Sequence, residues 1–288
     1  MADRGNTDIG ADDQDAIRNA VSKLENRDDP AFDEMLWLAT LAKLKRIDEL
    51  QDIFNAHDDK EAIQAKIDQA IHLAMGDGYN LTGHGIARNL AARYSDDALA
   101  RIFAKVASLC DGLERSLGVQ AFVTSGTLLG LIRDNRVIPH DDDFDLAYVS
   151  AFSNQEDILR ERFEIFTYLK SRENITIKKN GGHFGISYQE SGLYAYLDLF
   201  TGWIANGFFN EDPLDPNTIR ADDVAPVRKM EFYGVDVNVP QNPTALLEVN
   251  YGPNWRYPDP SFRFDFRKNG VFYAFLNAKE ETERYEQQ

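Results

Sequence analysis

The sequence predicts an α+β protein, in which a helical N-terminal region precedes a domain that mixes helices with short strands. Up to about Tyr94, apolar residues recur at spacings of three and four, which is typical of amphipathic helices. From about residue 96 onward, one long helical pattern is followed by short β-rich runs bounded by Gly, Pro, Asn or Asp. The chain has 288 residues, 43% of them hydrophobic, so it is long enough for two domains or one large one.

The N-terminal region is expected to consist of a tail and three or four helices. Residues 1–14 are polar and acidic with little to bury, so we expect them to be disordered. Residues 15–95 carry the helical stripes, of which the one from Leu36 to Leu50 is most simply a core face. Alternatively, these helices bind a protein partner or mediate dimerisation. The expected breaks between helices are Asp28–Pro30, His57–Asp59 and Gly76–Gly78.

Residues 96–288 are expected to form the second domain. Its first helix follows Ser95, a typical N-cap residue, and continues to Gly118. A further helix is expected over Gln155–Arg172, where apolar residues again recur at helical spacing. The expected strands are Val119–Thr124, Phe144–Val149, Phe184–Tyr188, Tyr194–Phe200 and Val235–Val239.

Charge and cysteine content exclude several classes of function. The 48 acidic residues exceed the 31 basic ones, and the net charge of −17 disfavours binding to a nucleic-acid polymer or to an anionic membrane. The single cysteine, Cys110, allows neither an internal disulfide nor a multi-cysteine zinc site. The sequence shows neither a signal peptide nor a transmembrane segment, so we expect a cytoplasmic protein.

The first chemical signal is a glycine turn at the end of a predicted strand. After Phe122–Thr124, the residues Ser125, Gly126 and Thr127 are expected to begin a short helix. Gly126 and Thr127 would then let a ligand phosphate approach backbone N–H groups at a helix N-terminus. Turns of this kind are common, so the motif alone does not establish a phosphate site.

The second signal is a run of aspartates. Asp143 and Asp145 are two residues apart, so on a strand they share one face while Phe144 and Leu146 face the core. Asp141 extends that face if the strand begins early. Adjacent carboxylates repel each other unless a cation lies between them, and Mg²⁺ or Mn²⁺ suits such hard oxygen ligands. The alternative is a solvated acidic turn.

These two signals together resemble the motif of a known family. The segment Gly126-Thr-Leu-Leu-Gly130, Arg133, and Ile138-Pro-His-Asp-Asp-Asp-Phe-Asp145 is similar to the LicD family of phosphotransferases, whose animal relatives include fukutin and the fukutin-related protein. The resemblance covers roughly residues 98–260 and leaves the N-terminal helices outside. It continues through Tyr196–Phe200, Phe232–Pro240 and Tyr251–Trp255.

The resemblance implies a nucleotidyltransferase-like fold with a mixed β-sheet flanked by helices. It also implies that Asp143 and Asp145 hold the metal together with Asp198 from a later strand. The residues themselves support Asp198, because a carboxylate between Leu197 and Leu199 is costly to bury without a partner. The alternative is a surface-facing Asp198 on an edge strand.

Other candidate residues concern the donor phosphate. Arg133 matches the arginine of the family motif, and either reaches a phosphate or forms a salt bridge with the aspartate run. His183, in a Gly-rich turn, and Lys179, beside Lys178, are further phosphate candidates. His140 stands where the family usually has tryptophan, and the sequence does not decide whether His140 or His183 acts in catalysis.

The function implied by the resemblance is metal-dependent transfer of a phosphorylated alcohol. The group would be phosphocholine, glycerol phosphate or ribitol phosphate, moved from a CDP-activated donor to a glycan or glycolipid hydroxyl with release of CMP. Asp198 or Asp141 would take the acceptor's proton. Two alternatives remain: a nucleotidyltransferase that uses an NTP and releases pyrophosphate, and a non-catalytic interaction protein. A P-loop kinase is not expected, because no Walker A motif is present.

Overall fold

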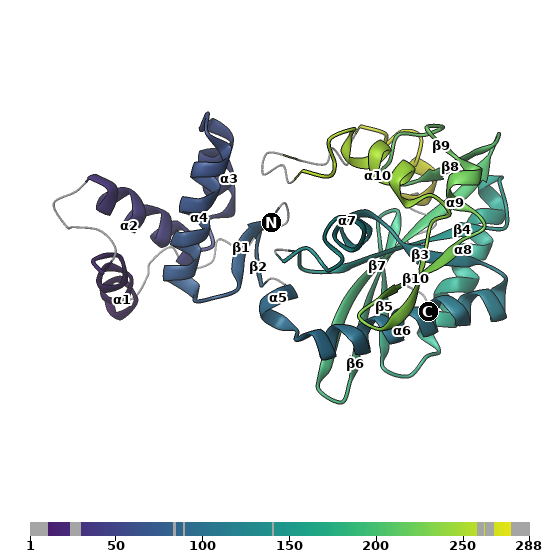
Figure 1. Cartoon of the computed structure of the whole chain (residues 1–288), viewed down its shortest axis with the longest axis horizontal. Coiled ribbons are helices and arrows are strands. Elements are labelled where there is room, and N and C mark those ends of the chain that lie inside the picture. Colours follow the sequence, from purple (N-terminus) through teal and green to yellow (C-terminus); the bar gives the residue numbers. More distant parts are fainter. Residues whose placement is uncertain are drawn as a thin grey trace. The chain divides into compact units, whose positions relative to one another are not determined.

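The computed structural model describes residues 11–23, 30–82, 85–88, 90–139, 141–257, 262 and 268–277. These residues form two compact units, the first mainly from residues up to Arg93 and the second mainly from later ones. Figure 1 traces the elements of both. Most of the tail expected over residues 1–14 lies outside the described residues. The first helix begins at Ala11, which is earlier than the expected start of the helical region.

The first unit is a small helical bundle with one hairpin. Its elements are α1 (Ala11–Val21), α2 (Pro30–Lys43), α3 (Ile47–Ala56), α4 (Lys60–Met75), β1 (Tyr79–Thr82), β2 (Gly85–Arg88) and α5 (Leu90–Arg93). The core includes Leu38, Leu41 and Leu50, so the stripe from Leu36 to Leu50 does supply a core face. The hairpin is absent from the all-helical prediction, because four-residue strands are too short to show a clear alternation.

The second unit is built on one mixed sheet. Its central order is β3-β4-β7-β6-β5, and β8 and β9 extend it from the last residues of β7. The strands are β3 (Gln120–Val123), β4 (Phe144–Ser150), β5 (Ile175–Asn180), β6 (His183–Glu190), β7 (Leu193–Ala205), β8 (Phe208–Glu211) and β9 (Ile219–Arg220). β4 and β7 are parallel, and the other pairs are antiparallel. The predicted α+β class with a mixed sheet is confirmed.

The remaining elements of this unit are mainly helices. They are α6 (Asp96–Leu117), α7 (Ser125–Asp134), α8 (Gln155–Lys170), α9 (Ala221–Val224), the hairpin β10 (Arg228–Phe232) and β11 (Val235–Val239), α10 (Pro243–Tyr251) and η1 (Ala274–Asn277). α6 has the predicted ends, because the Ser95 side chain accepts a bond from the Ala98 N–H and Gly118 adopts a left-handed φ of +72°. None of the described helices has the length and hydrophobicity to cross a bilayer.

α6 and α8 cover one face of the sheet (Figure 1). Phe103 of α6 meets Phe144 of β4 edge to face at 5.7 Å, and Phe166 of α8 lies 5.7 Å from Phe184 of β6. These residues are buried and form part of the core between helices and sheet. The opposite face of these strands carries Asp145 of β4, Asp198 of β7 and His183 of β6.

Gly130, the last residue of the Gly-Thr-Leu-Leu-Gly motif, allows a close contact between two backbone segments. The chain leaves α7 and passes back over it, so that a Cβ at position 130 would lie 2.6 Å from the Arg136 carbonyl oxygen and 2.7 Å from the Ile138 nitrogen. The Arg136 N–H also donates to the Gly130 carbonyl at 3.3 Å. Glycine here allows the segment that leads to the aspartate run to pack against the helix.

We therefore expect Gly130→Ala to lower the free energy of unfolding by about 1–3 kcal/mol, because backbone atoms cannot move away from the new methyl group. Urea denaturation measures this. Gly112→Ala in α6 is the control, since its Cβ would meet only the end of the flexible Tyr168 side chain. An equally stable Gly130→Ala protein would show that the loop shifts without cost.

Candidate functional site

The centre of the candidate site is the parallel pairing of β4 with β7. Asp145 and Asp198 are direct register partners, so their side chains share one face of the sheet. On the next strand, β6, the residue opposite Asp198 is Gly185. The Asp198 side chain is only 14% exposed. The carboxylate is thus held in a largely buried position beside a second one, which is the arrangement that calls for a cation.

Two further aspartates of the run, Asp141 and Asp143, lie near Asp145. Asp141, Asp143 and Asp145 each offer a carboxylate oxygen, and these oxygens lie within 4.8 Å of one another. Carboxylate oxygens are the ligands that Mg²⁺ and Mn²⁺ prefer. These three residues therefore fit a divalent cation in both spacing and chemistry, and Asp198 is not a member of this group.

The glycine turn lies against these carboxylates. The Thr127 N–H donates to Asp145 Oδ2 at 3.3 Å, and the Asp145 N–H donates to Thr127 Oγ1 at 2.8 Å. Asp145 therefore performs a capping role at the first turn of α7, since the N-cap residue Thr124 makes no side-chain cap bond. Gly126 is half-buried beside Thr127. The two signals that the sequence presented separately are joined by this reciprocal pair of bonds.

Tyr196 is a site residue that the sequence interpretation missed. It stands two residues before Asp198 on β7 and so shares its face. Burial, together with the negative charges of Asp198 and Asp143, raises the pKa of Tyr196 to about 12. Its hydroxyl lies so near Gly185 that a Cβ there would collide with it. Tyr196 therefore remains a protonated hydrogen-bond donor at the site, and its spacing from Asp198 was the available signal.

His183 lies beside the third carboxylate. Its Nε2 is 3.4 Å from Asp198 Oδ1 and 2.9 Å from Asn180 Nδ2, and its ring packs against Phe200 at 4.8 Å. The turn that carries it is fixed from behind by Arg162, which donates to the Gly181 carbonyl at 2.9 Å and the His183 carbonyl at 3.5 Å. The structure therefore brings His183 into the group that contains Asp198.

The structure gives the strand face of Lys179 and the ion pair of Arg133. Register pairs Lys179 with Phe184, on the face that α6 and α8 cover, whereas Lys178 pairs with Gly185 and shares the face of Asp198. Arg133 directs its Nε and Nη2 to Asp134 Oδ2, both at 2.9 Å, so its ion pair is with its chain neighbour. His140 lies outside the described residues.

A buried acid lies behind the turn. Glu211 of β8 is fully buried, and the Thr124 hydroxyl donates to its Oε1 at 3.2 Å. Burial raises the pKa of Glu211 to about 8, and the nearby Asp212 charge contributes in the same direction. At neutral pH the folded protein therefore holds Glu211 protonated, while the unfolded chain ionises it.

This predicts a pH-dependent stability. Because the folded state binds the extra proton, stability falls by up to about 1.4 kcal/mol per unit as the pH rises from the ordinary glutamate pKa toward 8, and then levels off. Glu211→Gln should flatten this slope and be the more stable protein at pH 8. Thermal melts from pH 5 to 9 test it, with the exposed Glu231→Gln as control. Parallel curves for wild type and Glu211→Gln would contradict the expectation.

Comparison with known proteins bears on residues 118–242, which match the family described as LicD/FKTN/FKRP, nucleotidyltransferase domain. The chain is 27% identical over 179 residues to ribitol 5-phosphate transferase FKRP of Homo sapiens and 26% identical to that of Mus musculus. Each match covers 59% of this chain and 36% of the relative, so the chain spans about a third of the length of these relatives. The uncharacterized protein RP689 of Rickettsia prowazekii (strain Madrid E) is 24% identical over 139 residues, 48% of each chain.

Proposed function

Because residues 118–242 of this chain match the LicD/FKTN/FKRP nucleotidyltransferase domain, we propose that the chain transfers a phosphorylated alcohol from a CDP-activated donor to a glycan or glycolipid hydroxyl, releasing CMP. The observation that carries the proposal is the pairing of Asp145 with Asp198 next to the Thr127 turn. The animal relatives are ribitol 5-phosphate transferases, which makes ribitol phosphate the first group to test.

The proposal includes Mg²⁺ or Mn²⁺, held by Asp143, Asp145 and Asp198. When bound, the ion supplies positive charge to the donor's pyrophosphate as the bond to the leaving nucleotide breaks. In this proposal the aspartates bind the ion, and the positive charge of the ion reduces the repulsion between the acidic protein and the anionic donor. Asp141 would contribute a further oxygen, because its carboxylate oxygen lies within 4.8 Å of those of Asp143 and Asp145.

The chain's own groups position the reactants. The first turn of α7 orients a phosphate group at Gly126, while the Thr127 N–H is bonded to Asp145, and the Tyr196 hydroxyl donates to a phosphate oxygen. The acceptor hydroxyl oxygen attacks phosphorus, the bond from phosphorus to the CMP oxygen breaks, and the acceptor's proton passes to a carboxylate, Asp198 or Asp141. Such a transfer depends on positioning and charge and needs no protein nucleophile.

Calorimetric titration of the whole chain with CDP, CMP, UDP and ATP, with and without Mg²⁺, tests the binding step. We expect Mg²⁺-dependent binding of CDP, seen also as a higher Tm. CMP release is then measured with CDP-ribitol, CDP-glycerol and CDP-choline. A preference for ATP with release of pyrophosphate would replace the proposal with an NTP-dependent nucleotidyltransferase. Failure to bind any nucleotide would overturn it in favour of an interaction protein.

A further inference from the structure

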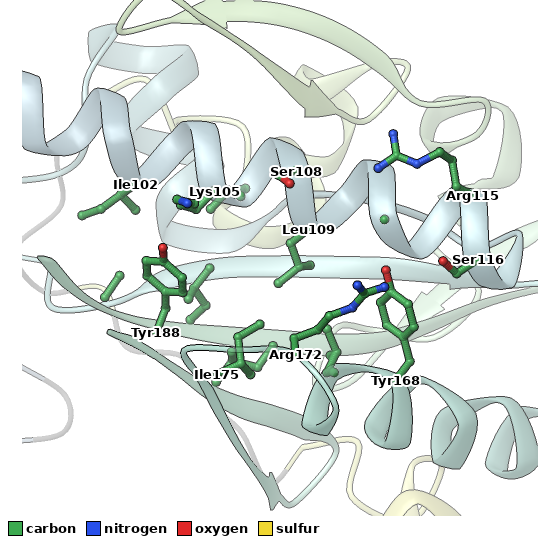
Figure 2. A pocket seen from close by; sticks show the side chains of 16 residues that line it. Ile102, Lys105, Ser108, Leu109, Arg115, Ser116, Tyr168, Arg172, Ile175 and Tyr188 are labelled. Atoms are coloured by element: carbon green, nitrogen blue, oxygen red, sulfur yellow. The ribbon is translucent and has the colours of Figure 1, made fainter. Parts of the chain in front are cut away.

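A cavity lies in the second unit, on the face of the sheet opposite the aspartates. It has a volume of about 310 Å³ and is enclosed by α6, the end of α8, and β5, β6 and β7 (Figure 2). Ala195 and Leu197 of β7 line it, whereas Tyr196 and Asp198 alternate to the other face. The cavity is therefore separate from the proposed transfer site.

The floor of this cavity is apolar. Side chains from the helix and from the sheet contribute to it, including Ile102, Val106, Leu109, Leu169, Ile186 and Leu197. Apolar cavities of about this size with a few polar groups at defined positions are typical of small-molecule sites. A ligand that fits this floor must itself carry an apolar portion.

The charge of the lining is opposite to that of the chain. The 16 lining residues include three cations, Lys105, Arg115 and Arg172, but no Asp or Glu. The whole sequence has 48 acidic residues against 31 basic ones. Lys105 is neutralised by Glu190 at 2.8 Å. Among the residues that the structure describes, no carboxylate pairs within 4.0 Å of Arg115 or Arg172, so positive charge remains at the cavity.

Arg172 marks one end of the cavity. Figure 2 shows Ser116 of α6 near Tyr168 and Arg172, while Lys105 and Tyr188 lie toward the other end and the Arg115 guanidinium is directed away from Arg172. The Arg172 guanidinium lies over the Tyr168 ring at 4.0 Å. The Tyr168 hydroxyl packs against α6 at Gly112, where a Cβ would approach it to 2.7 Å. The Arg172 guanidinium and the nearby hydroxyls of Tyr168 and Ser116 together provide donors suited to an oxyanion.

We propose that this cavity binds an anionic amphiphile, with an alkyl chain on the apolar floor and a phosphate or carboxylate head at Arg172, beside the hydroxyls of Tyr168 and Ser116. Charge complementarity selects the head group, and the apolar lining selects the tail. Neither property depends on the proposed transfer reaction, because no aspartate of that site lines the cavity.

The test uses the whole chain and dodecyl phosphate at concentrations below micelle formation, followed by calorimetry. We expect one molecule to bind per chain, and dodecanoate to bind as well if the head-group site accepts either oxyanion. Inorganic phosphate and dodecyl maltoside are the comparison ligands, one without a tail and the other without a charge. Equal binding of either comparison ligand, or no binding of dodecyl phosphate, would overturn the proposal.

Variants locate the binding. Arg172→Ala should weaken dodecyl phosphate binding at least about tenfold, since it removes the charge-assisted hydrogen bonds to the head group. Leu109→Trp should block binding by filling the floor. Arg160→Ala, on the exposed side of α8, is the control. Magnesium-dependent CDP binding should survive in Arg172→Ala, and amphiphile binding should survive in Asp198→Asn, so the two proposals fail separately. Unchanged affinity in Arg172→Ala would place the ligand elsewhere.

Discussion

Asp198→Asn is expected to abolish Mg²⁺-dependent binding of CDP and to lower CMP release by about 100-fold or more. Asparagine keeps the shape of the side chain but removes the charge that, with Asp145, would hold the ion. Asp198 is 14% exposed and is the register partner of Asp145 on the neighbouring parallel strand, so water has little access to compensate for the lost charge. The measurement is calorimetric binding together with a CMP-release assay.

The stability of the same variant separates a site role from a structural one. Without metal, removal of one of two adjacent carboxylates relieves repulsion, so Asp198→Asn should melt at the wild-type temperature or higher. Addition of Mg²⁺ and CDP should raise the Tm of the wild type but not that of Asp198→Asn. Asp222→Asn, whose side chain is 91% exposed, is the matched control and should behave as wild type. Wild-type binding by Asp198→Asn would remove Asp198 from the proposed metal site.

Arg162→Ala is expected to cause the largest loss of stability, about 3–5 kcal/mol. Arg162 is fully buried and joins separate parts of the second unit. It donates to the Leu276 carbonyl and the Gly181 carbonyl, both at 2.9 Å, and its guanidinium lies 4.8 Å from the centre of the Phe184 ring. Alanine would leave these carbonyls without their donor and create a cavity. Urea denaturation measures the loss.

Two further variants define the cause. Arg160→Ala, two residues away and paired with Asp157 on the surface, should change stability by less than about 1 kcal/mol. Arg162→Lys keeps the charge but cannot reach several carbonyls with one planar group, so it should be intermediate. A loss of less than about 1 kcal/mol in Arg162→Ala would show that water replaces the guanidinium without cost.

The local features of the candidate site could be predicted from the sequence. Alternation along one strand places Asp143 and Asp145 together, and the cost of burying a carboxylate singles out Asp198. The helix ends at Ser95 and Gly118 follow from capping chemistry that is local to the chain. What the sequence does not contain is the order of the strands, and so the adjacency of Asp145 and Asp198 had to come from the resemblance.

The position of Lys179 shows one limit of inference from the sequence. Lys179 differs from Lys178 by one position, which on a strand exchanges the two faces. The buried Ile177, two residues before Lys179, was a local sign of the correct face. Tyr196 and Arg162 matter because of partners on other elements, Gly185 and the turn before His183, and no spacing within their own segments reveals those partners.

The parallel pairing of β4 and β7 also constrains how the protein reaches its folded state. Neighbouring parallel strands cannot be joined by a tight turn, and here the intervening chain forms α8, β5 and β6. The β6–β7 pair can form early, because its strands are joined by a short turn, but Asp198 meets Asp145 only when that hairpin docks beside β4. During synthesis, a nascent chain that ends before β7 therefore lacks the pair of Asp145 and Asp198. The part of the proposed metal affinity that depends on Asp198 should consequently appear late in refolding, as one of the last properties that the chain acquires.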